Sequence, residues 1–285
     1  MRIVLALLAP LALIYIFLHI LWGVIAAVFV FPLLTPGGRD ALVRFWSRIL
    51  LVALGVRLQV EVAPGATEGP ETVEEAEMGS LLLLNHISWL DVFVLASVIP
   101  VRFVSKSEIA HWPIFGRLSV AVGTLFVERG RRHAVAAVNH AVAHRLQSGQ
   151  SIGIFPEGTT TEGDRVLRFH ANLVQSAIDV GASVRPVALR YTQDGEFSNA
   201  SAYIGEMTMA ESLWRVLLAP RLTAEVLWLP GMATRGRTRH ELANAARSAV
   251  TQALGLPDEE PLVFTVDGEL QPAPEREPVQ GTSAR

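Results

Sequence analysis

The chain has 285 residues, of which 51% are hydrophobic and only 18% are charged, against roughly 25% charged residues in an average soluble domain; an ordinary soluble enzyme and a largely disordered chain are both disfavoured. The absence of cysteine excludes disulfides, thiolate metal sites and a covalent cysteine intermediate. The formal net charge of −3 divides unevenly, because residues 257–285 carry seven acidic side chains against two arginines, a net of −5, which leaves +2 for residues 1–256.

The first predicted element is an apolar segment from Ile3 to Leu34 that contains no Asp, Glu, Lys or Arg. As a helix it would reach about 48 Å, against a hydrocarbon core of about 30 Å. Pro10, Gly23 and Pro32 would divide it into two helices that enter one leaflet and return, or a single helix would tilt. A signal peptide is the competing interpretation, but its apolar region is usually about 7–15 residues long. We therefore expect a retained membrane anchor.

A basic amphipathic helix is predicted directly after this segment. Arg44 and Arg48 stand four residues apart on one helical face, with apolar side chains over much of the rest. Such a helix would lie on an anionic lipid surface, and a helix packed on the soluble body is the alternative. Because only Arg2 stands on the other side of the apolar segment, the positive-inside rule places this flank in the cytoplasm. We expect a membrane protein whose following residues lie on the cytoplasmic side.

The remaining chain alternates between short apolar runs and longer amphipathic ones. Strands are predicted at Leu81–Leu84, Val101–Ser105, Thr124–Glu128, Ser151–Phe155, Val184–Tyr191, Ala202–Gly205 and Leu222–Leu229. Helices are predicted at Trp89–Val98, His133–Gln147, Ala171–Val180 and Arg237–Leu254. This alternation predicts an α/β fold with a mixed, largely buried sheet and flanking helices, preceded by the membrane-associated helical segment.

Four segments follow from these patterns. Residues 1–60 are the predicted membrane anchor and basic helix, and the acidic, breaker-rich residues 61–77 are a predicted linker. Residues 78–256 form the predicted catalytic domain. Residues 257–285, acidic and rich in proline, are a predicted disordered tail.

The run LLLLNHISWLDVFVL places His86 at the exit of a strand and Asp91 five residues later. In one continuous helix the two side chains would lie about 140° apart around the axis and could not meet. If His86 lies in a loop and Ser88 caps the following helix, Asp91 falls in the first turn and can bend back toward the imidazole. The carboxylate would then fix the tautomer and steady the imidazolium that forms when the histidine takes a proton. The alternative is that Ser88 and Asp91 only cap the helix.

This segment resembles the H-x-x-x-x-D block of the glycerolipid acyltransferase family, to which 1-acyl-glycerol-3-phosphate acyltransferases belong. Three further blocks follow in the family's order within residues 80–191, and the ordered set is far more specific than any single block. They are KSEIAHWPIFGRLSVAVGTLFVERGRR, with Gly123, Phe126, Val127 and Arg129 at the G-x-x-F-[IV]-x-R positions, FPEGTTT, with Phe155, Pro156, Glu157, Gly158 and Thr159, and VRPVALRY, with Pro186.

The resemblance implies that His86 and Asp91 are catalytic. It also implies a set of substrate-binding residues: Lys106, Gly123, Phe126, Arg129, Glu157, Gly158 and Thr159. The family's third block commonly continues with an arginine implicated in holding the acceptor's phosphate, whereas this chain has Thr160 and Thr161. The identity of the acceptor therefore stays open.

Glu157 also has an interpretation that does not depend on the family. Pro156 stops the ladder of a buried strand, and Gly158 lets the backbone approach a ligand closely. Glu157 would then stand at the carboxyl end of the strand, where α/β folds usually bind ligands. It could bind an acceptor hydroxyl or order an arginine; a turn of purely structural importance is the alternative.

The implied reaction moves a fatty acyl chain from acyl-CoA or acyl carrier protein to the free sn-2 hydroxyl of 1-acyl-glycerol-3-phosphate, giving phosphatidic acid. His86 would act as general base and Asp91 would orient it. The alternatives are another lysolipid acceptor, such as lyso-ornithine lipid or lysophosphatidylethanolamine, and a non-enzymatic lipid-binding relative. The expected partners are membrane lipids, the lysophospholipid acceptor and the acyl donor. We expect no cofactor, no metal ion and no nucleic-acid partner.

Overall fold

The structure is a computed structural model that describes residues 2–66, 69–70, 78–128, 132–258, 262–264 and 270–272. Its helices are α1 (Arg2–Ile25), η1 (Ala26–Val30), η2 (Phe31–Leu33), α2 (Pro36–Ala53), α4 (Leu90–Val98), η3 (Ser107–His111), α5 (Phe115–Ala121), α6 (Arg132–Gln147), η4 (Asn172–Val174), α7 (Gln175–Val180), α8 (Met209–Leu217) and α9 (Arg239–Ala253). Its strands are β1 (Arg57–Val62), β2 (Leu81–Leu84), β3 (Val101–Lys106), β4 (Leu125–Val127), β5 (Ser151–Ile154), β6 (Val184–Gln193), β7 (Glu196–Phe197), β8 (Leu222–Trp228), β9 (Leu262–Phe264) and β10 (Leu270–Pro272).

The main sheet has eight strands in the order β1-β8-β6-β2-β5-β3-β4, with β7 paired to β6. The strands β2 to β6 run parallel to one another, whereas β8 is antiparallel to β6 and parallel to β1. The sheet is therefore mixed, and the predicted α/β class is confirmed. Because β2, β5, β3 and β4 are parallel, their carboxyl ends share one edge, where α/β folds usually bind ligands.

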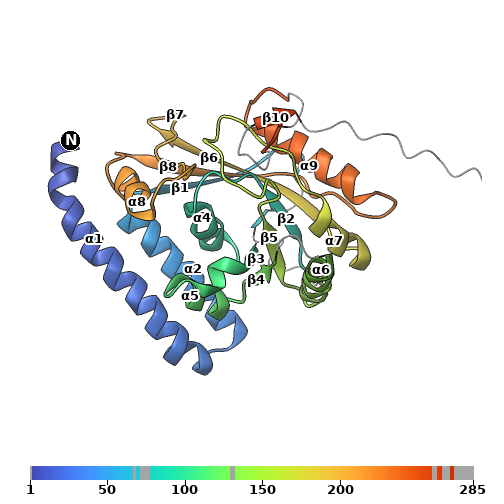
Figure 1. Ribbon diagram of the computed structural model, residues 1–285, viewed down its shortest axis with the longest axis horizontal. Coiled ribbons are helices and arrows are strands. Elements are labelled where there is room, and N and C mark those ends of the chain that lie inside the picture. Colours follow the sequence, from blue (N-terminus) through green and yellow to red (C-terminus); the bar gives the residue numbers. More distant parts are fainter. Residues whose placement is uncertain are drawn as a thin grey trace, which may run out of the picture.

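Helices cover both faces of the sheet, as Figure 1 shows. The four leucines of β2 are completely buried, and alternate ones face opposite sides because successive side chains of a strand point to opposite faces. Leu82 and Leu84 pack in the cluster that includes side chains of α2 and α4. Leu81 and Leu83 pack in the cluster that includes side chains of α6 and α9. A continuous apolar run is what a parallel strand buried on both faces requires.

The apolar beginning of the chain is a helix that does not break at Pro10 or Gly23. α1 continues through η1 and η2, and α2 then returns beside it, so the two form the helical hairpin seen in Figure 1. Within the described residues, one stretch, Pro10–Leu33, is long and apolar enough to cross a membrane by length and composition.

α1 and α2 are joined where His19 meets Trp46. The two rings stack with centroids 4.6 Å apart, and the side chain of each residue bonds the backbone carbonyl of the other at 3.1 Å. A side chain at Gly23 would place its Cβ 2.8 Å from the indole nitrogen of Trp46. Gly23 therefore permits a close helix crossing and is not a helix breaker here.

The structure moves the expected boundary between the membrane segment and the catalytic domain. β1 pairs with β8 along its whole length, so the boundary predicted between residues 60 and 61 falls within a strand of the main sheet. Leu50, Leu51 and Leu54 of α2 are only 2% exposed and belong to the same core as α4. Both α2 and β1 are thus part of the domain. β1 was not predicted because its sequence, RLQVEV, alternates as in an exposed edge strand and lacks the continuous apolar run from which the other strands were predicted.

Two other expectations differ from the structure. Residues 202–205 are not a strand, and within the predicted tail β9 and β10 pair antiparallel. The rest of the tail beyond residue 258, and residues 67–68 and 71–77 of the predicted linker, lie outside the described residues.

Candidate active site

His86 and Asp91 are in hydrogen-bond contact, as predicted for a histidine in a loop before the helix. β2 ends at Leu84, α4 begins at Leu90, and His86 lies in the loop between them, so Asp91 falls in the first helical turn. The helix begins later than expected, because its cap position is Trp89 rather than Ser88. His86 Nδ1 lies 2.8 Å from Asp91 Oδ2.

Asp91 is completely buried and accepts four hydrogen bonds. Its Oδ2 accepts from His86 Nδ1 and from the backbone N–H groups of Ile87 at 2.7 Å and Ser88 at 2.9 Å, while its Oδ1 accepts from the Tyr191 hydroxyl at 2.7 Å. A carboxylate can only accept, so Nδ1 of His86 carries the proton of the shared bond. This tautomer leaves the lone pair on Nε2.

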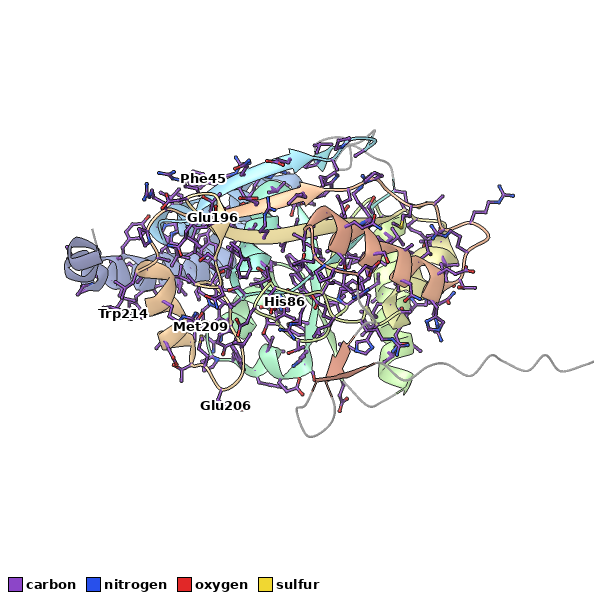
Figure 2. The ribbon with its side chains drawn as sticks, turned by 90° about the horizontal axis from the view of Figure 1, so that it is seen from above. Phe45, His86, Glu196, Glu206, Met209 and Trp214 are labelled. Carbon is purple, nitrogen blue, oxygen red and sulfur yellow. The ribbon has the colours of Figure 1, made fainter. Side chains whose placement is uncertain are left out.

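The ring of His86 is stacked and faces partly outward. It lies against Phe155 with centroids 4.0 Å apart and 16° between planes, and Phe155 stacks in turn on Phe103. The His86 side chain keeps 20% of its surface exposed. Figure 2 shows His86 within the body of the molecule, with Phe45 and Trp214 toward the side that holds α1. The imidazole is therefore partly accessible from outside.

The FPEGTTT loop holds the backbone of His86 from both sides. The His86 N–H donates to Glu157 Oε1 at 2.7 Å, and the His86 carbonyl accepts from Thr161 N at 2.9 Å. The other Glu157 oxygen, Oε2, accepts from Leu167 N at 2.7 Å. Glu157 is only 5% exposed and both its oxygens bond backbone groups. Both Glu157 oxygens thus bond the backbone around His86, while its predicted role in binding substrate stays a prediction.

Burial raises the pKa of Glu157 to about 8, against 4.5 ordinarily. The two backbone N–H groups and Arg247 act in the opposite direction, and the charge of Asp91 adds to the rise. Desolvation prevails because the carboxyl has no access to water.

Protein stability is expected to fall as the pH rises from about 5 to 8, by up to about 1.4 kcal/mol per pH unit from this group alone. The folded state keeps the Glu157 proton to about pH 8, whereas the unfolded chain releases it near 4.5. The stability that Glu157 contributes is complete below pH 4.5 and is lost as the pH rises through about 8. Urea unfolding of the wild type and of Glu157→Gln across this range measures it.

Glu157→Gln should be less stable overall, by about 1–3 kcal/mol, because one backbone N–H loses its acceptor. Its stability should nevertheless lack the slope that Glu157 contributes. Parallel stability curves for the two proteins would contradict the raised pKa.

Asn85 and Tyr191 are two site residues that sequence reasoning gave no role. Asn85 Nδ2 donates to the Leu189 carbonyl at 2.9 Å, and its Oδ1 accepts from Leu189 N at 2.7 Å, so the side chain extends the pairing of β2 with β6 to the residue before His86. Tyr191 supports Asp91. Asn85 lies in the first sequence block and Tyr191 in the fourth, and this placement was the signal in the sequence that could have identified them.

The structure brings some of the predicted substrate-binding residues to the carboxyl edge of the sheet. Lys106 ends β3 and is exposed, and Phe126 lies in β4 level with Ser105. Gly158 has a φ of +73° in the turn after Phe155, and Thr159 follows it, half-buried.

Gly123 is not brought there. Gly123 follows the end of α5 and lies beside Arg102, near the start of β3. Its φ of +81° is the left-handed conformation that commonly ends a helix. Arg129 lies outside the described residues. Thr160, which stands where the family has arginine, donates its hydroxyl to the Tyr203 carbonyl.

The described part of the chain holds no group of three or more His, Cys, Asp or Glu side chains suited to a metal ion. The arrangement at His86 suits proton transfer. The ring is partly exposed, and Asp91, Phe155 and the backbone bonds fix it in place.

This chain is similar in sequence and in fold to known proteins. Residues 66–190 match the family model described as Acyltransferase. A lyso-ornithine lipid O-acyltransferase of Pseudomonas aeruginosa is 35% identical over 216 residues, which are 76% of this chain and 79% of that protein. A 1-acyl-sn-glycerol-3-phosphate acyltransferase of Neisseria meningitidis is 38% identical over 191 residues, 67% of this chain and 71% of that protein.

The crystal structure of the 1-acyl-sn-glycerophosphate (LPA) acyltransferase PlsC from Thermotoga maritima has the same fold. The TM-score is 0.64 at 18% identity, and the match covers 90% of this chain and 97% of that chain. The extent and identity of the sequence matches, together with the family model, establish descent. The chain belongs to the acyltransferase family, among the acyltransferases of lysophospholipids.

Proposed function

We propose that this acyltransferase moves a fatty acyl chain from acyl-CoA or acyl carrier protein to the free sn-2 hydroxyl of 1-acyl-glycerol-3-phosphate, giving phosphatidic acid. The observation that supports this chemistry is the His86–Asp91 pair, in which Nδ1 lies 2.8 Å from Asp91 Oδ2 and the His86 side chain keeps 20% of its surface exposed. A fixed, partly exposed imidazole is suited to take a proton from a hydroxyl.

In the proposed mechanism, His86 Nε2 removes the proton of the acceptor hydroxyl as its oxygen attacks the thioester carbonyl carbon. The new C–O bond forms, the tetrahedral intermediate collapses, and the C–S bond breaks. The thiolate takes the proton back from His86 and leaves as the free thiol. Asp91 steadies the imidazolium between the two proton transfers. The acceptor is itself the nucleophile, so no acyl-enzyme forms.

A lyso-ornithine lipid is the second candidate acceptor. The hydroxyl of Thr160 is engaged by the Tyr203 carbonyl, so this position supplies neither the arginine charge nor a free donor for a phosphate. The ornithine headgroup carries an ammonium and a carboxylate in place of the phosphate. The similarity to a lyso-ornithine lipid O-acyltransferase supports this candidate to a comparable degree.

Turnover with a panel of lysolipids distinguishes these acceptors. We expect purified full-length enzyme to acylate lysophosphatidate faster than lyso-ornithine lipid or lysophosphatidylethanolamine, measured with labelled acyl-CoA and, in parallel, labelled acyl carrier protein. If lysophosphatidate is inert and another lysolipid reacts, the proposed acceptor is wrong and the proposed chemistry stands. The donor that supports turnover identifies the thiol that leaves.

We also propose that the enzyme sits on the inner membrane, with the exposed apolar face of the α1–α2 hairpin in the lipid and the active site on the cytoplasmic side. One face of α1 is apolar and exposed, with Leu11 at 65%, Phe17 at 61% and Leu18 at 54%. Two of the arginines expected to contact lipid bond the protein instead through their Nε atoms. Arg39 donates to the Phe31 carbonyl and Arg48 to the Ser97 carbonyl.

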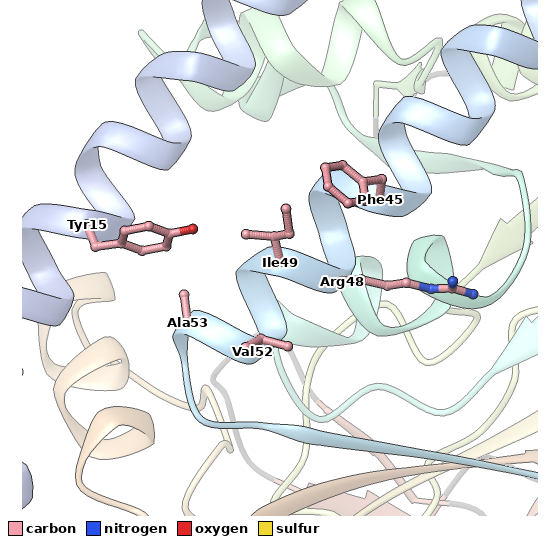
Figure 3. A pocket seen from close by; sticks show the side chains of 6 residues that line it. All are labelled: Tyr15, Phe45, Arg48, Ile49, Val52 and Ala53. Atoms are coloured by element: carbon pink, nitrogen blue, oxygen red, sulfur yellow. The ribbon is translucent and has the colours of Figure 1, made fainter.

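The hairpin has a hollow on its surface that supports contact with lipid tails. Its volume is about 320 Å³, and Figure 3 shows it between α1 and α2. The side chains that line it are almost all apolar: Tyr15, Phe45, Arg48, Ile49, Val52 and Ala53. Phe45 is 60% and Val52 75% exposed. Large exposed apolar surface of this kind is typical of membrane contact.

A further inference from the structure

Tyr191 lies on β6 in direct contact with the catalytic pair. Its side chain is 1% exposed, and its hydroxyl donates to Asp91 Oδ1 at 2.7 Å. His86 bonds the other oxygen, Oδ2. The tyrosine and the histidine therefore share one buried carboxylate. One hundred residues separate Tyr191 from Asp91 in sequence, so only the pairing of β6 beside β2 brings them together.

We propose that Tyr191 is a positioning residue that sets the basicity of His86 through Asp91. The inference rests on the proposed role of His86 as general base. A hydrogen bond to Oδ1 draws negative charge toward the tyrosine, so less is available at Oδ2 to stabilise a proton on the imidazole. The Tyr191 hydroxyl thereby shares the carboxylate charge that would otherwise act on the imidazole alone.

The tyrosine is suited to this role because it stays a donor. Burial, with the neighbouring charge and hydrogen bond of Asp91, raises the pKa of Tyr191 well above its ordinary value. The hydroxyl therefore remains protonated across the working range. Among the other titratable groups, the carboxyl of Glu157 interacts with Asp91, and Arg247 interacts with Glu157. Neither changes between the variants below.

Tyr191→Phe removes the hydroxyl and keeps the ring. We expect the titration midpoint of His86 to rise by about one pH unit, because one donor to a buried carboxylate is lost. The acid limb of kcat/KM should move up by the same amount, with turnover above that limb within a few-fold of wild type. Diethyl pyrocarbonate, which reacts with unprotonated imidazole, measures the midpoint when its modification of the His86 peptide is followed by mass spectrometry against pH.

Tyr15→Phe is the matched control, since the same hydroxyl is lost on α1, away from Asp91. It should leave the His86 midpoint unchanged. A tyrosine that only fills the core would give Tyr191→Phe a lower melting temperature with the wild-type midpoint, and that result would overturn the proposal.

A second variant changes the hydrogen bond without removing it. The chain has three tyrosines, so Tyr15→Phe with Tyr203→Phe leaves Tyr191 as the sole position for 3-fluorotyrosine. The fluorinated phenol is more acidic and donates a stronger hydrogen bond, so the His86 midpoint should move down, opposite to Tyr191→Phe. A midpoint that stays or rises would count against the proposal, even if Tyr191→Phe fails to fold.

The labelling needs no substrate, which separates the two proposals. If every lysolipid is inert while the midpoint moves as expected, the proposed function is wrong and the role of Tyr191 stands. If turnover is normal and the midpoint does not move in either variant, the role of Tyr191 is wrong and the proposed function stands.

Discussion

His86→Ala is expected to lower kcat/KM for acyl transfer by about 10²–10⁴-fold, the usual contribution of a positioned general base. Nε2 is the proposed acceptor of the hydroxyl proton, and alanine has no group in its place. The backbone bonds that fix this residue, from its N–H to Glu157 and from Thr161 N to its carbonyl, remain available to alanine. The variant should therefore fold, and transfer of labelled acyl chains to the reacting lysolipid measures the loss.

His140→Ala serves as the matched control, because His140 is exposed on α6 and the change is chemically the same. Its turnover should equal that of the wild type. Wild-type turnover by His86→Ala, with its melting temperature preserved, would refute the mechanism, since the reaction would then proceed without the imidazole.

The His–Asp pair could be predicted because its geometry is local. Only five residues separate His86 from Asp91, and the geometry of a helix start decides whether they meet. A strand, a short loop and a first helical turn were each readable from apolar pattern, and their junction brings the carboxylate to the ring. The cap was misplaced by one residue, which left the pair intact.

Asn85, Tyr191 and Glu157 received no role or a different one because their partners are distant in sequence. Asn85 bonds a residue 104 positions away, Tyr191 one 100 away, and Glu157 one 71 away. A single sequence shows the residue type at these positions and not the strand order that selects its partner. Gly123 illustrates the same limit, since spacing alone does not tell a helix-ending glycine from one beside a ligand.

These distant bonds explain how three of the four sequence blocks, the first, the third and the fourth, make one site. The third block holds the backbone of His86 through Glu157 and Thr161, and stacks Phe155 on its ring. The fourth block bonds Asp91 through Tyr191. Both blocks therefore bond the first, and the buried carboxyls of Glu157 and Asp91 have their hydrogen-bond partners within the protein. A substrate is left to meet His86 Nε2 and the residues at the carboxyl edge around it.

The apolar face of α1 is expected to matter only when the acceptor is in a bilayer. Removal of residues 1–57 is not a clean test, because Leu50, Leu51 and Leu54 of α2 are core residues packed with α4. Serine at three exposed α1 and η1 positions changes the surface and leaves that core intact. Suitable positions are Leu18 at 54%, Leu21 at 45% and Phe29 at 68% exposed.

The triple variant should turn over long-chain lysolipid in anionic vesicles about 100-fold more slowly than the wild type. Burying one such side chain in lipid is worth about 1.5–3 kcal/mol, so three changes weaken membrane binding by several kcal/mol even when each is only partly inserted. With a short-chain acceptor free in solution, its rate should stay within a few-fold of wild type. Vesicle co-flotation measures the binding itself.

Serine at Val60, Val62 and Met78 gives a control with the same number of apolar-to-serine changes. These exposed apolar residues lie on or near β1 and β2, outside the helical hairpin. This control should leave both rates near wild type. Equal losses on both acceptors in the α1 variant would mean that this helix supports the fold, and no loss on either would mean that it is not the anchor. Loss in vesicles alone would show that the hairpin brings His86 to its substrate, because the imidazole network would be unaltered.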